Sequence, residues 1–236
     1  MNKKQIFFLI FLILPHFSFS DTFSVDDKFY FGFGAGVINP NDVDIDITVA
    51  ETINGVAFSG NINGEFKFDV GYQISTVLGY RLSDSLSIEG EFGYLNFDYD
   101  SVNLTAGGTA TSGGVTFTGS ANTSYVIDGN IDSYSFVFGP NFDFDFSNKL
   151  EFLIGGGIGF SFYSDEIKSV GGSTGLSYDE DETDFTAKFK AGINYSMSEK
   201  SYAQLGYGFN FVNSGIDNFT DDFTAHNFDL KVIFNF

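Results

Sequence analysis

Residues 134–146 read Tyr-Ser-Phe-Val-Phe-Gly-Pro-Asn-Phe-Asp-Phe-Asp-Phe, with an aromatic residue or proline at every second position. A period of two places alternate residues on opposite faces of a β-strand. One face of this strand is therefore almost wholly aromatic, while the other carries mainly Gly, Ser, Asn and Asp. Such small polar residues cannot fill the core of a soluble β-sandwich. We therefore expect the aromatic face to point outward, into lipid.

The same alternation recurs in seven other segments. In residues 28–38, for example, Phe29, Phe31 and Phe33 alternate with Tyr30 and small glycines. The eight segments are residues 28–38, 70–82, 86–94, 134–146, 150–163, 185–197, 203–211 and 224–236. This pattern predicts an all-β protein, a transmembrane antiparallel up-and-down β-barrel of eight strands.

Composition supports a barrel and argues against helices. The 236 residues include 32 Phe and 28 Gly but only 3 Pro. Mean hydropathy is +0.03, which is typical of barrels because polar lumen residues offset the lipid-facing ones. No internal run approaches the roughly 18 apolar residues of a membrane-spanning helix. A helical membrane protein is therefore excluded, and the small polar inner faces also argue against a soluble ligand-binding barrel of the lipocalin type.

The chain begins with a predicted secretory signal peptide. Lys3 and Lys4 precede the apolar residues 6–14, and Ser18 and Ser20 resemble the small residues of a cleavage site. We expect cleavage after Ser20, so residues 1–20 form the signal peptide and residues 21–236 the barrel domain.

The exported chain is acidic and contains no cysteine. The formal net charge of −20 becomes −22 once Lys3 and Lys4 are removed. This charge argues against nucleic acid as a partner. The lack of cysteine excludes a disulfide framework and a cysteine-linked lipid anchor.

Connections between the eight segments alternate between short and long. Three short turns are predicted at residues 83–85, 147–149 and 198–200, and four long polar loops at residues 39–65, 100–131, 164–183 and 213–222. In an outer-membrane barrel the short turns face the periplasm and the long loops face the outside. Both termini are then expected in the periplasm.

Two of the long loops contain strand-like sequence of their own. Val43, Ile45 and Ile47 alternate with Asp42, Asp44 and Asp46 in the first loop, where the dipeptide at residues 54–55, Asn-Gly, predicts a hairpin turn. The Gly-, Ser- and Thr-rich residues 106–124 contain Val115 and Phe117. We interpret both segments as strands that extend above the membrane. A barrel of ten or twelve strands is the alternative.

Residues 79–94 resemble the second hairpin of small outer-membrane barrels of the OmpA/OmpX/opacity type. The end of the chain resembles the C-terminal signal that the barrel assembly machinery reads in such proteins. That signal would consist of Phe228, Leu230, Val232, Phe234 and Phe236. The resemblance implies a surface protein of the Gram-negative cell outer membrane, in contact with outer-membrane lipid and lipopolysaccharide.

The predicted inner face carries many charged residues. They are Arg81, Glu89, Glu91, Glu151, Lys188, Lys190, Asp229 and Lys231, together with Asp143 and Asp145. The interior of an eight-stranded barrel is only wide enough for side chains to fill it, and buried charges persist when they are paired. We therefore predict a salt-bridged plug, with a path for protons or small ions as the alternative.

Evidence for enzymatic or metal chemistry is weak in this sequence. After cleavage of the signal peptide the only histidine is His226, which is predicted to face outward near the loop end. We therefore expect no enzyme activity, no cofactor and no His- or Cys-based metal site. The acidic run Asp179, Glu180, Asp181 and Glu182 offers oxygen ligands for a weak divalent-cation loop. It lacks the alternating spacing and turn glycine of a dedicated site, so a solvated charge run is favoured.

Two functions therefore remain open at this stage. The favoured one is a plugged barrel that anchors long acidic surface loops in a structural, adhesion or surface-antigen role, with a host or surface ligand at the loops. The alternative is a narrow channel for ions or small solutes, which requires the lumen charges to line water.

Overall fold

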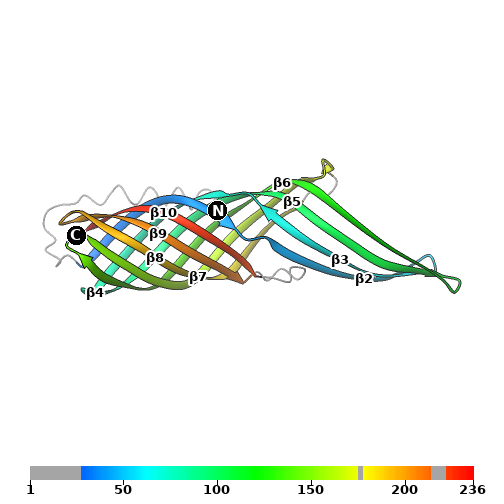
Figure 1. Ribbon diagram of the computed structural model, residues 1–236, viewed down its shortest axis with the longest axis horizontal. Coiled ribbons are helices and arrows are strands. Elements are labelled where there is room, and N and C mark those ends of the chain that lie inside the picture. Colours follow the sequence, from blue (N-terminus) through cyan, green and yellow to red (C-terminus); the bar gives the residue numbers. More distant parts are fainter. Residues whose placement is uncertain (1–27, 175–177, 214–221) are drawn as a thin grey trace, which may run out of the picture.

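The computed structural model describes residues 28–174, 178–213 and 222–236 of the chain, so the predicted signal peptide lies outside the described residues. Within these ranges no helix is both long and apolar enough to span a membrane. The described residues form antiparallel strands (Figure 1). Their bounds are β1 (Phe29–Pro40), β2 (Val43–Ile53), β3 (Val56–Phe68), β4 (Gly71–Ser83), β5 (Leu86–Ser112), β6 (Val115–Ser147), β7 (Leu150–Val170), β8 (Tyr178–Ser198), β9 (Ser201–Asn213) and β10 (Phe223–Asn235).

Eight of these strands close into a ring. Neighbours pair in the order β1, β4, β5, β6, β7, β8, β9 and β10, and β10 then pairs with β1. The β1–β10 seam runs from the pair Tyr30 and Asn235 to the pair Pro40 and Ala225. The prediction of an eight-stranded antiparallel barrel is therefore confirmed. Because β2 and β3 lie outside the ring, the described strands do not form the alternative ring of ten or twelve.

The aromatic face of each ring strand points outward, as predicted. On β6, Phe138 and Phe146 are 53% and 70% exposed, whereas Ser133 and Asn141 on the opposite face are fully buried. Exposure of large aromatic side chains around the whole ring is favourable only in an apolar solvent.

The first two segments predicted as long loops contain strands that continue past the ring, which confirms the strands expected within those loops. Strands β5 and β6 continue past the ring and turn at Gly113 and Gly114, whose φ angles are 59° and 81°. The β2–β3 hairpin turns at Asn54 and Gly55, with φ of 51° and 80°, as predicted for this dipeptide. The Gly-, Ser- and Thr-rich residues 106–124 are strand apart from the turn at residues 113–114, as expected.

The far parts of β5 and β6, together with β2 and β3, form a four-stranded sheet that we call the extension. Its strand order is β2-β3-β5-β6. Figure 1 shows the extension continuing along the long axis beyond the ring. Strands β7 and β8 are also longer than predicted and carry residues 164–170 and 178–184 in strand conformation. We call this end of the barrel the long-hairpin end.

The three short turns lie at the opposite, short-turn end and share one construction. The turns follow Ser83, Ser147 and Ser198, and each serine Oγ accepts a hydrogen bond from the backbone N–H two residues later, at 3.3–3.4 Å. A hydroxyl that bonds its own backbone two residues on stabilises a tight turn. The three predicted turns are therefore confirmed.

Candidate functional site

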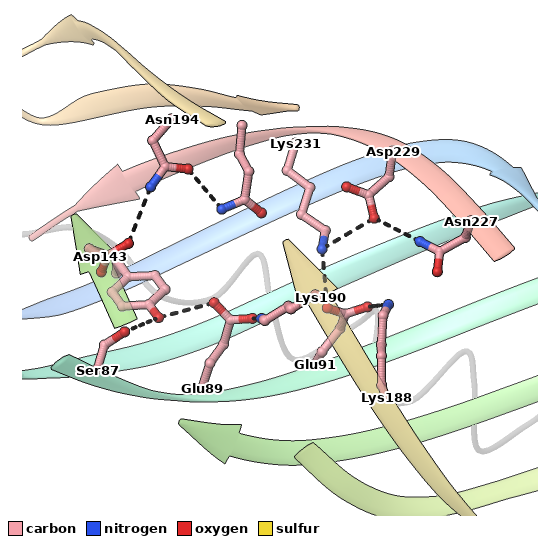
Figure 2. A network of polar contacts seen from close by, with 12 residues as sticks. Ser87, Glu89, Glu91, Asp143, Lys188, Lys190, Asn194, Asn227, Asp229 and Lys231 are labelled. Atoms are coloured by element: carbon pink, nitrogen blue, oxygen red, sulfur yellow. Dashed lines mark hydrogen bonds and ion pairs between the residues drawn. The ribbon is translucent and has the colours of Figure 1, made fainter. Parts of the chain in front are cut away.

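Glu91 lies at the centre of a buried ion-pair network inside the ring (Figure 2). Its Oε1 atom is 2.5 Å from Lys188 Nζ, and its Oε2 atom is 3.1 Å from Lys231 Nζ. Lys231 Nζ is also 3.4 Å from Asp229 Oδ2. All four side chains are less than 10% exposed. One carboxylate of β5 thus holds two lysines, from β8 and from β10.

A second ion pair joins Glu89 to Lys190. The Tyr30 hydroxyl donates a hydrogen bond to Glu89 Oε2 at 3.0 Å and lies 3.1 Å from Ser87 Oγ. Glu89 and Glu91 share the inner face of β5, and Lys188 and Lys190 share that of β8. The spacing of two along each strand therefore places both pairs side by side.

Amide side chains complete the environment of Asp229. Gln73 and Asn227 each donate a hydrogen bond to Asp229 Oδ2, at 3.1 and 3.2 Å. A Cβ atom at Gly206, the cross-strand partner of Asp229, would collide with this carboxylate. Glycine at this position therefore provides the space that the carboxylate occupies.

The network as a whole is electrically balanced. Three ammonium groups, of Lys188, Lys190 and Lys231, face three carboxylates, of Glu89, Glu91 and Asp229. Removing ions from water is costly unless each one is paired and hydrogen-bonded. Each of the six groups has an ion-pair partner, and one buried oxygen, Asp229 Oδ1, has no hydrogen-bond partner among the described residues. The pairing allows the network to persist as a neutral layer in a poorly hydrated interior.

Apolar layers lie on both sides of the charged layer. On the short-turn side, buried side chains of four strands cluster together, namely Tyr30, Val77, Tyr202 and Ile233. On the long-hairpin side, Ile38, Phe97 and Ala225 form a second cluster, in which each residue is at most 1% exposed. The order along β10 from Ala225 through Asp229 and Lys231 to Ile233 places the charges between the two clusters.

The free space beside the network is small. A cavity lined by Glu89, Glu91, Lys188, Lys190, Val137 and three glycines has room for about one water molecule.

The sequence matches the outer membrane protein beta-barrel domain family over residues 9–236. The chain belongs to this family. Among curated proteins none matches the sequence. Membership places the protein in the outer membrane, as the sequence predicted, and the ring described above is the family's fold.

Several solved structures are similar to this outer-membrane barrel at low sequence identity. Neisserial surface protein A is 13% identical with a TM-score of 0.47, over 88% of this chain and 97% of that one. The attachment invasion locus protein Ail of Yersinia pestis is 14% identical with a TM-score of 0.43, over 89% and 99%. OprG of Pseudomonas aeruginosa is 10% identical with a TM-score of 0.49, over 89% and 95%.

Four of the predicted lumen residues lie outside the ion-pair network of this family member, namely Arg81, Asp143, Asp145 and Glu151. Asp143 accepts a hydrogen bond from the Asn194 side-chain amide at 3.4 Å. Arg81 packs over the rings of Tyr30 and Tyr202, with its Cζ atom 5.6 and 5.8 Å from their centroids. Glu151 is the cross-strand partner of Asp145, near the short turn after Ser147. The period of two predicted that these residues face the lumen, but it could not predict their positions along the barrel axis.

The prediction also missed four polar members of the network, Tyr30, Gln73, Ser87 and Asn227. Each of them lies on the predicted inner face, so the alternation in the sequence did indicate that these side chains point into the lumen. The prediction named only charged residues, because the sequence alone does not indicate which uncharged lumen side chains form hydrogen bonds with them.

The acidic run falls on β8 and not in a loop, which corrects the prediction. Asp181 and Glu182 are consecutive strand residues whose Cα partners are Ser164 and Tyr163 on β7. Consecutive strand residues point to opposite faces, so these two carboxylates do not converge. Among the described residues no cluster of three or more His, Asp or Glu side chains could hold a metal ion.

His226 lies on the outer face of β10 among aromatic residues. Its Nδ1 atom is 2.8 Å from the Tyr207 hydroxyl, and its ring lies 5.1 Å from the ring of Phe209. The outward direction agrees with the predicted parity.

The terminal strand carries the residues of the predicted assembly signal. Phe228, Leu230, Phe234 and Phe236 are each at least 40% exposed on the outer face, and Val232 shares their parity. The Phe236 N–H donates to the Phe29 carbonyl at 2.9 Å, so the last residue lies at the barrel seam. Assembly signalling remains a proposal that rests on these positions.

Replacing Phe236 with Lys should lower the yield of folded protein in the outer membrane several-fold. The change removes the terminal aromatic residue and places a charge on the lipid face, at a depth-dependent cost of up to about 4 kcal/mol. The measurement is the amount of heat-modifiable protein in outer-membrane fractions. Asn235→Ser is the matched control, because Asn235 lies on the other face, and its yield should equal that of the wild type. Equal yields for both variants would contradict the assembly role.

Proposed function

We propose that the protein is a sealed outer-membrane anchor that displays the extension outside the cell for adhesion or other surface contacts. One observation carries this proposal. The lumen is crossed by a neutral, buried layer of paired charges between two apolar clusters. A barrel filled in this way holds its strands together but offers ions little water to pass through.

The orientation of the barrel follows from the lengths of its connections. In outer-membrane barrels, short turns face the periplasm and long hairpins face the outside. The turns after Ser83, Ser147 and Ser198 then face the periplasm, as do the start of β1 and the end of β10. In this proposal the extension lies outside the cell, with lipopolysaccharide and lipid around the ring.

The proposal needs no catalysis and no cofactor. The runner-up function is a narrow channel for ions or small solutes. It would require the charges of the network to separate and line water, and single-channel recording distinguishes the two functions.

A trimmed barrel tests the display function directly. Ala106 and Ala121 are cross-strand partners, as are Ile47 and Ile62. Their strand ends lie close together, so residues 107–120 and 48–61 can each be replaced by an Asn-Gly turn. We expect the trimmed protein to keep its heat-modifiable migration on SDS gels, because the ring and its network are untouched.

Cells that carry the full or the trimmed protein are then compared for retention on polystyrene, bare or coated with extracellular-matrix protein. We expect the trimmed protein to reduce retention at least about tenfold at equal surface level. Equal retention by both would contradict a role for the extension in adhesion. Stable ion conductance by the full protein would favour the channel.

A further inference from the structure

One edge of the extension is open. Residues 101–112 of β5 pair with residues 115–126 of β6, whereas the pairing of β6 with β7 begins only at Ile127. Among the described strands, residues 115–125 of β6 therefore have no neighbour on their second side. The open edge of a sheet is a template for pairing with another strand.

This edge carries no charge, although the chain as a whole is strongly acidic. Residues 115–126 contain no Asp, Glu, Lys, Arg or Pro, and every one of them is exposed. The opposite edge of the same sheet, β2, carries Asp44, Asp46 and Glu51. Charged residues on an edge strand discourage pairing with other chains. Of the two edges of the extension, only the β6 edge lacks this protection, so two copies of this strongly acidic chain can approach there without local repulsion.

The free backbone groups on this edge can be assigned to particular residues. The Val126 carbonyl accepts a hydrogen bond from the Gly171 N–H at 2.8 Å, so it points away from β5. The β5–β6 register from Val126 to Val115 has no bulge. Because the direction alternates along a strand, the peptide groups of Thr116, Thr118, Ser120, Asn122 and Ser124 also point to the open side.

This edge is self-complementary in an antiparallel pairing. With a twofold axis at Ser120, the midpoint of residues 115–125, Thr118 lies opposite Asn122 of a second copy. Val115 then lies opposite Tyr125 on the apolar face. The five residues with outward peptide groups would form about ten hydrogen bonds between the two copies. An isologous contact of this kind closes after two copies.

The direction of the strands decides where the second copy must be. Antiparallel pairing makes the two extensions point in opposite directions, and two barrels in one membrane both point the same way. Two barrels in facing membranes satisfy the geometry. We propose that the open β6 edge joins two copies of this protein from neighbouring cells, which rests on the proposed display of the extension outside the cell.

A cysteine at the twofold axis tests this contact, because the chain has no native cysteine. Two cell populations express the full chain with Ser120→Cys, each with a different epitope tag in a periplasmic turn. They are first labelled with a membrane-impermeant maleimide to verify exposure. Unlabelled cells are then mixed and oxidised, and dimers that carry both tags are quantified on non-reducing gels.

We expect maleimide labelling and a dimer that carries both tags. The matched control Thr109→Cys lies opposite Thr118 on β5, away from the edge, and should give at least about tenfold less dimer.

Clumping of cells that express the protein is a second measurement of the contact. It should fall at least about tenfold for Thr118→Pro, which removes an outward N–H. Thr118→Val keeps this N–H and should clump like the wild type.

Several outcomes would overturn the inference. The first is that Ser120→Cys reacts with the maleimide but gives no dimer that carries both tags. The second is that dimers form only between copies from the same cell population. The third is that Thr109→Cys gives as much mixed-tag dimer as Ser120→Cys. Failure of maleimide labelling, by contrast, would refute the outward display itself and with it the proposed function.

Discussion

Replacing Glu91 with Ala is expected to destabilise the folded barrel by about 3–5 kcal/mol, the usual cost of removing one partner of a buried ion pair. Glu91 is the carboxylate that two lysines share. Its loss leaves Lys188 without its ion-pair partner, whereas Lys231 keeps its contact with Asp229 at 3.4 Å. The measurement is the free energy of unfolding in urea after refolding into detergent or lipid.

Double-mutant cycles resolve which lysine depends on Glu91. Lys188→Ala combined with Glu91→Ala should recover the largest part of the loss, because the orphaned ammonium is then absent. The cycle with Lys231→Ala should show a smaller coupling of the same sign. Lys190 pairs with Glu89 and not directly with Glu91, so its cycle with Glu91 should show the smallest coupling of the three. Additivity in all three cycles would mean that these side chains face water.

Gly79→Ala is expected to destabilise the barrel by about 1–3 kcal/mol, through overpacking. Gly79 is the cross-strand partner of Tyr30, and an added Cβ atom would overlap the Tyr30 ring. The ring must then move, which also weakens the hydrogen bond from its hydroxyl to Glu89. Unfolding in urea again measures the change.

The companion variants separate packing from general effects of alanine. Gly107 on the extension has no heavy atom within 4 Å of an added Cβ atom, so Gly107→Ala should leave the free energy of unfolding within about 0.5 kcal/mol of wild type. Adding Tyr30→Ala to Gly79→Ala should relieve the overlap and make the two changes less than additive. A Gly79→Ala protein as stable as the wild type would show that the Tyr30 ring does not occupy this space.

The barrel fold could be predicted because a period of two indicates which residues of each strand face the lipid and which face the lumen. Alternating Phe with Gly, Ser and Asp in residues 134–146 identified both faces of β6. The sequence predicted strand in residues 106–124 and in residues 134–146, but not that residues 115–146 belong to the single strand β6, because the exposed Thr and Ser of residues 115–126 are common in loops as well as in strands. Pairing with β5 decides between these two states, and pairing is not a local property.

The candidate site was predictable in kind but not in its partners. Parity placed Glu91, Lys188 and Lys231 in the lumen, yet the ion pairs depend on the stagger of strands that lie far apart in the sequence. Glu91 and Lys231 are separated by 140 residues. The apolar clusters around Phe97 and Tyr202 were hidden for the same reason, since each cluster gathers single residues from several strands.

The central claim is that paired charges and apolar layers seal the lumen, and single-channel recording in planar bilayers tests it most directly. The protein is first refolded and shown by heat-modifiable migration to be a closed barrel, so that an inactive sample is not mistaken for a sealed one. At molar KCl the account predicts no discrete conductance steps above the lipid baseline. Stable, salt-dependent steps from the folded wild-type protein would contradict it and show that the charges around Glu91 line a water-filled path.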